Sequence, residues 1–196
     1  MISDTETGSA RERLLAAADK LFYAEGIHVV GIDRVIEEAG VAKASLYACF
    51  GSKEGLIVAF IEGRLQRRKD RTHRALALLT NPRDRLLAVF DVLDTFIKDP
   101  GFNGCTFMNV SAESPAGGAV AEAARASRTW SLSLFTELAR DAGATDPEAL
   151  AHQLAMLYDG ALVSSQMDHD RDAAQRAKAA AAALVDTATR RRRSSR

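Results

Sequence analysis

The sequence predicts an all-α protein of about nine helices, with a small N-terminal three-helix unit that contains a helix-turn-helix. Nearly half of the 196 residues, 47%, are apolar, whereas the chain has only four prolines and 6% aromatic residues. Ala, Leu, Arg and Glu, which favour helices, are abundant. Apolar residues recur three and four positions apart between glycine and proline breaks, which is the spacing of one helical face.

Charge and cysteine content exclude several classes of protein. The 26 basic residues balance the 26 acidic ones, so any binding to DNA must come from a local patch. Two cysteines do not make a disulfide framework, and we expect the protein to lie in a reducing cytoplasm.

No apolar run approaches the roughly 20 residues that span a bilayer, so we expect no membrane partner. Residues 1–8 lack the features of a signal peptide and predict a disordered lead-in.

The first helix begins at a capping box and ends at a glycine. Ser9 and Glu12 have the capping-box spacing, and Gly26 follows the last apolar residue of the helix. Its apolar stripe consists of Leu14, Leu15, Ala18, Leu21 and Phe22.

Residues 31–53 predict two short helices around a glycine turn and the start of another helix. Ile32, Val35, Ile36 and Ala39 share one face, and Gly40 follows where the chain needs a positive φ. The next helix has a small, mildly basic outer face, formed by Lys43, Ala44, Ser45 and Tyr47. This pattern is typical of a helix-turn-helix whose second helix enters the major groove.

Six further helices are expected after the helix-turn-helix. Ser52 can cap the first of them, and Asn81-Pro82 begins the second. Either Thr145 or Asp146 can cap the helix that begins near Pro147. The expected ranges are about 53–79, 82–98, 103–113, 119–142, from 147 onward, and 172–189. Residues 190–196 form a basic tail that is too polar to fold alone.

The first 70 or so residues resemble the TetR family of bacterial transcriptional regulators. The similarity includes Leu14 to Phe22 with Gly26, and Ile32 to Ile36. It is strongest in the run 39–47, AGVAKASLY, and continues through Phe50, Ser52, Lys53, Glu54 and Leu56. Residues 104–113 are similar to a Gly-Cys-x-Phe-x-Asn motif of one branch of the family.

The resemblance implies a DNA-binding domain at 9–55 and an effector-binding and dimerisation domain at 56–189. It implies a homodimeric repressor that binds double-stranded operator DNA. A small hydrophobic or amphipathic effector would release the repressor from that DNA. The last two helices would form the dimer interface, with candidate residues Leu150, Leu154, Leu157, Ala161, Ala177, Ala181 and Leu184.

Candidate DNA contacts lie on and around the recognition helix. Lys43 can reach a phosphate or a guanine edge, Tyr47 can donate to a phosphate, and Lys53 stands at a helix N-terminus that can bind another. Relatives of the TetR pattern commonly have Ser or Thr caps at positions 31 and 42, where this chain has Gly31 and Ala42, and the missing cap at Ala42 costs about 1 kcal/mol. The full candidate set is Gly31, Arg34, Ala42, Lys43, Ala44, Ser45, Tyr47, Ala48 and Lys53.

Apolar side chains with a few polar groups are what an effector site needs. The resemblance places this site among the fourth to eighth helices, although any one of the candidates is more simply explained as ordinary core. The candidates are Phe60, Phe90, Phe96, Cys105, Phe107, Met108, Trp130, Leu134 and Tyr158. Cys105 could sense oxidants from a helix N-terminus, but a simply buried cysteine is the better interpretation.

Two other classes of function remain as alternatives. One is an all-helical small-molecule-binding protein or enzyme that uses the C-terminal cavity, and the other is a helical interaction module. The sequence argues against an enzyme, because it has no glycine-rich phosphate loop, no nucleophile–His–acid set and no cluster of metal ligands. We expect no cofactor and no metal.

Overall fold

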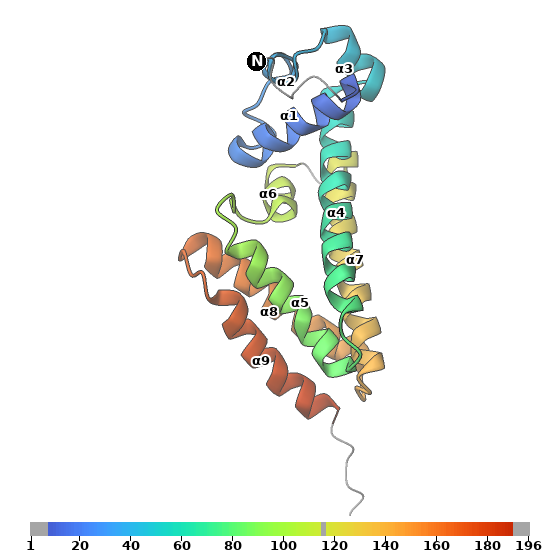
Figure 1. The fold of residues 1–196 in the computed structure, drawn as a ribbon, viewed down its shortest axis with the longest axis vertical. Helices are drawn as coiled ribbons and strands as arrows, with labels where there is room; N and C mark the ends of the chain where they lie inside the picture. Colours follow the sequence, from blue (N-terminus) through green and yellow to red (C-terminus); the bar gives the residue numbers. More distant parts are fainter. Residues whose placement is uncertain (1–7, 115–116, 190–196) are drawn as a thin grey trace, which may run out of the picture. The chain divides into compact units, whose positions relative to one another are not determined.

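A computed structural model describes residues 8–114 and 117–189, and within these ranges the regular secondary structure is entirely helical, as predicted (Figure 1). The predicted disordered ends, 1–8 and 190–196, lie outside the described residues apart from Gly8. The helices are α1 (Ala10–Glu25), α2 (Ile32–Ala39), α3 (Lys43–Phe50), α4 (Lys53–Ala77), α5 (Pro82–Ile97), α6 (Thr106–Glu113), α7 (Ala119–Asp141), α8 (Pro147–Met167) and α9 (Ala173–Ala188).

Helix starts follow the predicted capping residues. The backbone N–H of Glu12 donates to the Ser9 side chain, while the Glu12 carboxylate accepts from the Ser9 N–H, which completes the capping box. Asn81 caps α5 through the N–H groups of residues 83 and 84. At α8, Asp146 and not Thr145 supplies the cap, since its carboxylate accepts from the N–H of Ala149 at 2.9 Å.

Some helix ends differ from the predicted ranges by a few residues. The start of α6 at Thr106, after the expected residue 103, follows from Gly104, whose φ of +78° is incompatible with a helix. The end of α4 at Ala77 falls before the expected residue 79. Gly40 adopts the predicted left-handed conformation, with φ +60° and ψ +41°.

The chain divides into two compact units. Unit 1 comprises 1–66 and 105–126, and unit 2 comprises 67–104 and 127–196, of which only the residues given above are described. The helices α4 and α7 are each divided between the two units, with one part in unit 1 and the other part in unit 2. The functional boundary expected between residues 55 and 56 stays a prediction.

Unit 1 has a core in which α6 and the start of α7 join the helix-turn-helix. Val110 of α6 and Val120 and Ala124 of α7 are buried in the same cluster as the apolar faces of α1 to α4. Full burial of each large aliphatic side chain contributes about 1.5–3 kcal/mol. The fully buried aliphatic residues of this core are Leu14, Val30, Val35, Leu46, Leu56 and Ile61.

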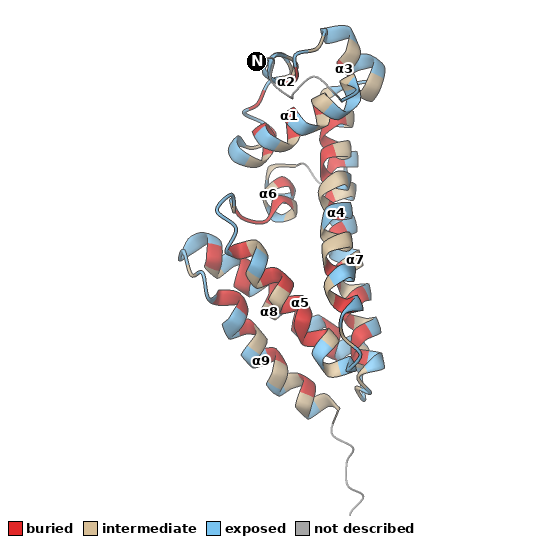
Figure 2. Cartoon of the chain, viewed as in Figure 1, coloured by how far each residue is buried: buried red, intermediate tan, exposed pale blue. Residues whose placement is uncertain are grey.

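Unit 2 is built around α5, α8 and α9, which pack against one another (Figure 1). Figure 2 shows the buried residues concentrated on α5 and on the inner faces of its neighbours. Phe90, Phe135 and Tyr158 form a ring cluster, with centroid distances of 6.0 Å and 6.2 Å from Phe90 to the other two rings. Such aromatic contacts add stability beyond the area that they bury.

Most of the residues predicted for the dimer interface are covered within the chain, and their contact with a second subunit stays a prediction. Five of the seven, Leu150, Leu154, Ala161, Ala177 and Ala181, are buried, and Leu157 and Leu184 are half-buried. The reason is that α8 and α9 pack on each other and on α5, so this apolar seam forms part of the core of unit 2. The same helices leave a different apolar stripe exposed.

No single described helix is long and apolar enough to cross a membrane. Only α3 and α4 taken together reach such a length and composition, and they meet at a bend of 64°.

We predict that Leu46→Ala lowers the free energy of unfolding by about 2–5 kcal/mol, because it removes a fully buried side chain from the core under α3. Chemical denaturation followed by circular dichroism measures this loss. Leu78→Ala is the matched control, since Leu78 is 85% exposed and its truncation should change stability by less than about 0.5 kcal/mol. Equal losses in the two variants would contradict the placement of α3.

Candidate nucleic-acid interface

The predicted recognition helix is held by its backbone turns, not by side-chain caps. Gly31 and Ala42 occupy the N-cap positions of α2 and α3, and neither makes a side-chain capping bond. The N–H of Gly40 donates to the carbonyls of Ile36 and Glu37, which ends α2 sharply. Leu46 then anchors α3, because it is fully buried in the core of unit 1.

The structure places most of the predicted DNA contacts on the surface of unit 1. The outer face of α3 is accessible, and its largest side chain, Tyr47, is 47% exposed. Ser45 and Lys53 are half-buried. The exposed members of the set are Gly31, Arg34, Ala42, Lys43, Ala44, Tyr47 and Ala48. Their contact with DNA stays a prediction.

Lys43 reaches back from the start of α3 to α2. Its Nζ donates to Asp33 Oδ1 at 2.9 Å, and this hydrogen bond raises the pKa of Lys43. The Lys43 and Asp33 side chains are 56% and 81% exposed, so water and salt weaken the pair. A DNA phosphate can therefore compete for the Lys43 ammonium at little cost.

Arg34, also predicted to contact DNA, is engaged with α1. Its two terminal nitrogens donate to the two carboxylate oxygens of Glu25, with 2.8 Å between Nη2 and Oε1. This bidentate hydrogen bonding raises the pKa of Arg34. In this arrangement Arg34 links α2 to α1, and a contact with DNA requires that the pair with Glu25 opens.

The start of α4 depends on a glycine that sequence reasoning did not single out. A Cβ at Gly55 would lie 2.1 Å from the carbonyl oxygen of Phe50, so only glycine allows α4 to begin this close to the end of α3. The N–H of Gly55 donates to the predicted cap, Ser52, at 3.0 Å. Together these contacts fix the half-buried Lys53 beside the recognition helix.

Arg64, which the sequence shows only as part of a basic stretch, joins α4 to α1 within unit 1. Its guanidinium donates to both carboxylate oxygens of Asp19, at 2.8 and 3.0 Å, and lies 3.7 Å from the ring centroid of Tyr23. Lys20 and Glu38 pair at 2.7 Å and connect α1 to α2. The sequence contains both members of the Arg64–Asp19 pair, a basic and an acidic residue. Spacing alone does not pair them, because they lie 45 positions apart.

Glu113, the last residue of α6, fastens α6 to the loop between α1 and α2. Its Oε2 accepts from the backbone N–H of Ile27 at 3.1 Å and of His28 at 3.4 Å. The His28 ring Nε2 lies 2.6 Å from the Glu113 carbonyl oxygen. Gly26 turns the chain toward this carboxylate with a φ of +93°. The segment that leads into the helix-turn-helix is therefore bonded to α6.

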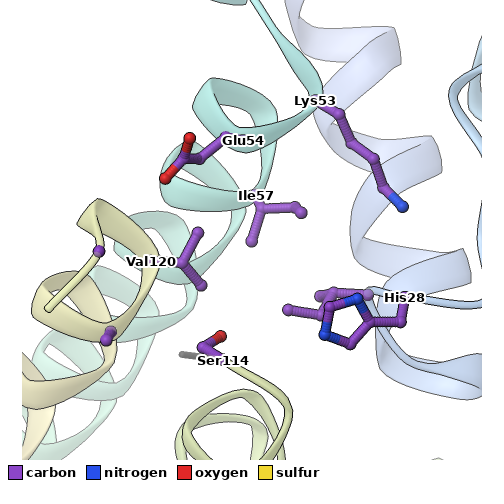
Figure 3. A pocket seen from close by; sticks show the side chains of 9 residues that line it. His28, Lys53, Glu54, Ile57, Ser114 and Val120 are labelled. Carbon is purple, nitrogen blue, oxygen red and sulfur yellow. The ribbon is translucent and has the colours of Figure 1, made fainter. Parts of the chain in front are cut away.

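Unit 1 also contains a cavity of about 380 Å³ beside these contacts (Figure 3). Lys53 and His28 line one side of it, Glu54 and Val120 lie on the other, and Ile57 stands between them. Ile27, Ser114, Gly118 and Ala121 complete the lining. Of all the predicted site residues, this cavity includes only Lys53.

The predicted effector residues fall in both units. Phe60, Cys105, Phe107 and Met108 belong to unit 1, whereas Phe90, Phe96, Trp130, Leu134 and Tyr158 belong to unit 2. Phe60 is buried against Phe22, with 5.6 Å between the ring centroids, and Cys105 is only 7% exposed. Their role in effector binding stays a prediction. Among the described residues, no group of three or more His, Cys, Asp or Glu side chains could hold a metal ion.

Comparison with known proteins identifies the architecture. The sequence pattern of the family described as bacterial regulatory proteins, tetR family, matches residues 14–60, and that of the tetracyclin repressor-like C-terminal domain matches residues 82–181. The chain belongs to the TetR family. It is therefore a DNA-binding transcriptional regulator and not an enzyme, and its DNA-binding element is the helix-turn-helix of α2 and α3.

Solved structures of TetR regulators share the fold over nearly the whole chain. A TetR-family regulator from Streptomyces coelicolor is 34% identical, with a TM-score of 0.86 over 92% of this chain and 96% of its own. A putative TetR regulator from Streptomyces avermitilis is 30% identical, with a TM-score of 0.80 over 92% of this chain and 98% of its own.

Relatives with named roles act in both directions. The transcriptional activator FasR of Mycolicibacterium smegmatis is 34% identical over 45% of this chain, and the repressor NemR of Escherichia coli is 34% identical over 53% of it. The matched regions span only 40% of FasR and 53% of NemR. TetR membership thus establishes regulation of transcription, while its direction needs a separate argument.

We predict that Lys43→Gln weakens DNA binding and lowers the slope of log affinity against log salt by roughly 0.9, the value for the loss of one phosphate contact. Fluorescence anisotropy on the DNA that flanks the gene, between low and moderate salt, measures this slope. Lys20→Gln serves as the control, because Lys20 is also an exposed lysine with a carboxylate partner, Glu38, but belongs to α1. An unchanged slope in Lys43→Gln would remove Lys43 from the interface.

Proposed function

We propose that this TetR regulator is a homodimeric repressor that leaves its operator when a small hydrophobic or amphipathic molecule binds. The observation that carries the proposal is the combination of an accessible α3 face with a direct bond between α6 and the α1–α2 loop. Glu113 offers a route by which a movement of α6 changes the position of the helix-turn-helix. NemR, a named repressor among the relatives, supports this direction.

Residues of α3 and of the start of α4 carry the proposed contact with operator DNA. Lys43 exchanges Asp33 for a phosphate, Tyr47 donates its hydroxyl to the backbone, and Lys53 adds a charge at the N-terminus of α4. Ala44 and Ala48 are small and allow the helix to approach the bases closely. Since the formal net charge of the chain is zero, this local patch supplies the attraction, and the affinity depends steeply on salt.

The proposed functional division keeps DNA binding in residues 9–55 and effector binding and dimerisation in 56–189. The nine candidate effector residues all lie in the second range. Those of unit 2 include Phe90 and Tyr158, which are buried in the ring cluster, and the half-buried Phe96 and Trp130, which can offer an apolar surface to a ligand.

We place the dimer interface on the exposed stripe of α8 and α9, in place of the buried seam predicted from the sequence. Met156 is 61% exposed, Val163 is 38% exposed and Met167 is 74% exposed, and all three lie on one face of α8 together with Gly160. Exposed alanines of α9 provide a second close-packing surface, formed by Ala179, Ala180 and Ala183. Two such helices from each subunit would form a four-helix interface across a two-fold axis.

An activator role is the alternative direction, because FasR is a named activator. In vitro transcription from the promoter that flanks the gene distinguishes the two. A repressor lowers the transcript yield as the protein is added, and the DNA shifts in a gel at the same concentrations. An increased yield would replace the repressor with an activator, and no shifted DNA at low salt with the dimer intact would overturn both.

We predict that Met156→Arg yields monomers, because it places a charge in the middle of the exposed stripe of α8. Multi-angle light scattering measures the mass in solution. Leu78→Arg is the control, since Leu78 is also an exposed apolar residue but lies outside α8 and α9. A Met156→Arg protein that remains dimeric would place the interface on another surface.

A further inference from the structure

Most arginines of unit 2 for which a partner is described pair with a carboxylate. Arg83 lies 2.6 Å from Asp186, Arg140 lies 3.0 Å from Glu148, and Arg176 lies 2.6 Å from Asp170. These pairs are on the surface and need no ligand. Two arginines of α4, Arg68 and Arg71, have a different environment that consists mainly of rings and hydroxyl groups.

Arg71 is half-buried against an aromatic wall. Its guanidinium carbon lies 5.1 Å from the ring centroid of Phe96, and Phe96 in turn packs edge-on against Phe102 at 5.2 Å. The Nε of Arg71 is buried and has no hydrogen-bond partner among the described residues. A buried donor of a charged group that lacks an acceptor costs free energy of folding. An acceptor supplied by a bound molecule would remove this cost at the Arg71 Nε.

The charges around Arg71 do not remove this cost. Burial lowers the pKa of Arg71, and the nearby Arg68 and Arg74 act in the same direction. Asp99 and Tyr158 oppose the shift, but neither outweighs the burial. The site therefore holds a cation whose surroundings favour an added negative charge.

Arg68 lies one turn before Arg71 on α4 and is fixed by neighbours in α7. It donates at 2.9 Å to the hydroxyl oxygens of both Ser127 and Ser131, which are buried. Its guanidinium also lies 5.2 Å from the Trp130 ring and 4.9 Å from the Tyr158 ring. Residues three apart on a helix are neighbours, so the two guanidinium groups and these rings belong to one cluster of unit 2.

We propose that the effector is an apolar monocarboxylate, whose carboxylate binds Arg71 and whose apolar body packs against Phe96 and Trp130. This inference rests on the proposed effector-binding function and names the chemistry of the ligand. A carboxylate accepts two parallel hydrogen bonds from a guanidinium, including one from Nε, which matches the donor that lacks an acceptor. One carboxylate is sufficient as an acceptor, because Arg68 already donates to the hydroxyl groups of two serines.

Matched pairs of probes test the charge directly. Calorimetric titration of the intact protein compares 2-naphthoate with 2-naphthamide and decanoate with decanamide, so that each pair differs only in the carboxylate. We expect the carboxylate of at least one pair to bind roughly tenfold or more tightly than its amide, the difference that a charged hydrogen bond supplies. Equal affinities within both pairs, or no binding of either carboxylate at millimolar concentration, would overturn the proposal.

Variants of α4 locate the charge. Arg71→Gln should reduce the carboxylate affinity to that of the amide, while Arg74→Gln, an exposed arginine on the same helix, should leave it unchanged. If the two variants bind the carboxylate equally well, Arg71 is not its partner and the proposal fails. Arg71→Met adds a test without ligand: removal of a half-buried cation whose Nε has no acceptor among the described residues should keep or raise the melting temperature, whereas a clear drop would show that Arg71 is structural and would count against the proposal.

The readouts separate this inference from the proposed repressor function. If the carboxylate binds in an Arg71-dependent way but leaves the operator complex intact, the ligand chemistry stands and release by the effector fails. If another, uncharged molecule releases the operator and competes with no carboxylate, the release mechanism stands and the ligand chemistry fails.

Discussion

The position of the recognition helix depends on an apolar core that the helix-turn-helix shares with α6 and the start of α7. Leu46 fixes α3 in this core, and Val110 and Val120 are buried in the same core. These side chains belong to one close-packed cluster, so a shift of α6 disturbs the packing beneath α2 and α3. The hydrogen bonds from Ile27 and His28 to Glu113 then add a directional link to this non-directional packing.

Charged side chains of unit 1 divide into those that stabilise the unit and those that remain available to DNA. Arg34 and Arg64 make bidentate contacts with Glu25 and Asp19, which hold α2 and α4 to α1. Lys43 has only an exposed partner and can exchange it for a phosphate. The proposed interface is therefore less basic than the count of cations suggests, which agrees with a chain of zero formal net charge.

Helix caps, turns and apolar faces were predictable from the sequence, whereas the residues that pack against each face were not. Capping at Ser9 and Asn81, the left-handed turn at Gly40 and the burial of Leu46 each follow from residues a few positions apart. The seam of α8 and α9 was correctly recognised as apolar, but periodicity does not say which neighbour covers a face, and in this chain α5, α8 and α9 cover most of it. The pairing of Arg64 with Asp19, the need for glycine at 55 and the setting of Arg71 depend on contacts between distant segments.

Hydrogen exchange at the backbone amides of Ile27 and His28 tests most directly whether Glu113 fastens α6 to the DNA-binding helices. Both amides donate to the Glu113 carboxylate, so they should be protected in the wild-type protein and exchange roughly tenfold faster or more in Glu113→Ala. Glu122→Ala is the control. The described ion pair of Glu122 is with Arg125, three residues along α7, and both side chains are exposed. Unprotected amides in the wild-type protein, or equal exchange in the wild type and Glu113→Ala, would contradict the account.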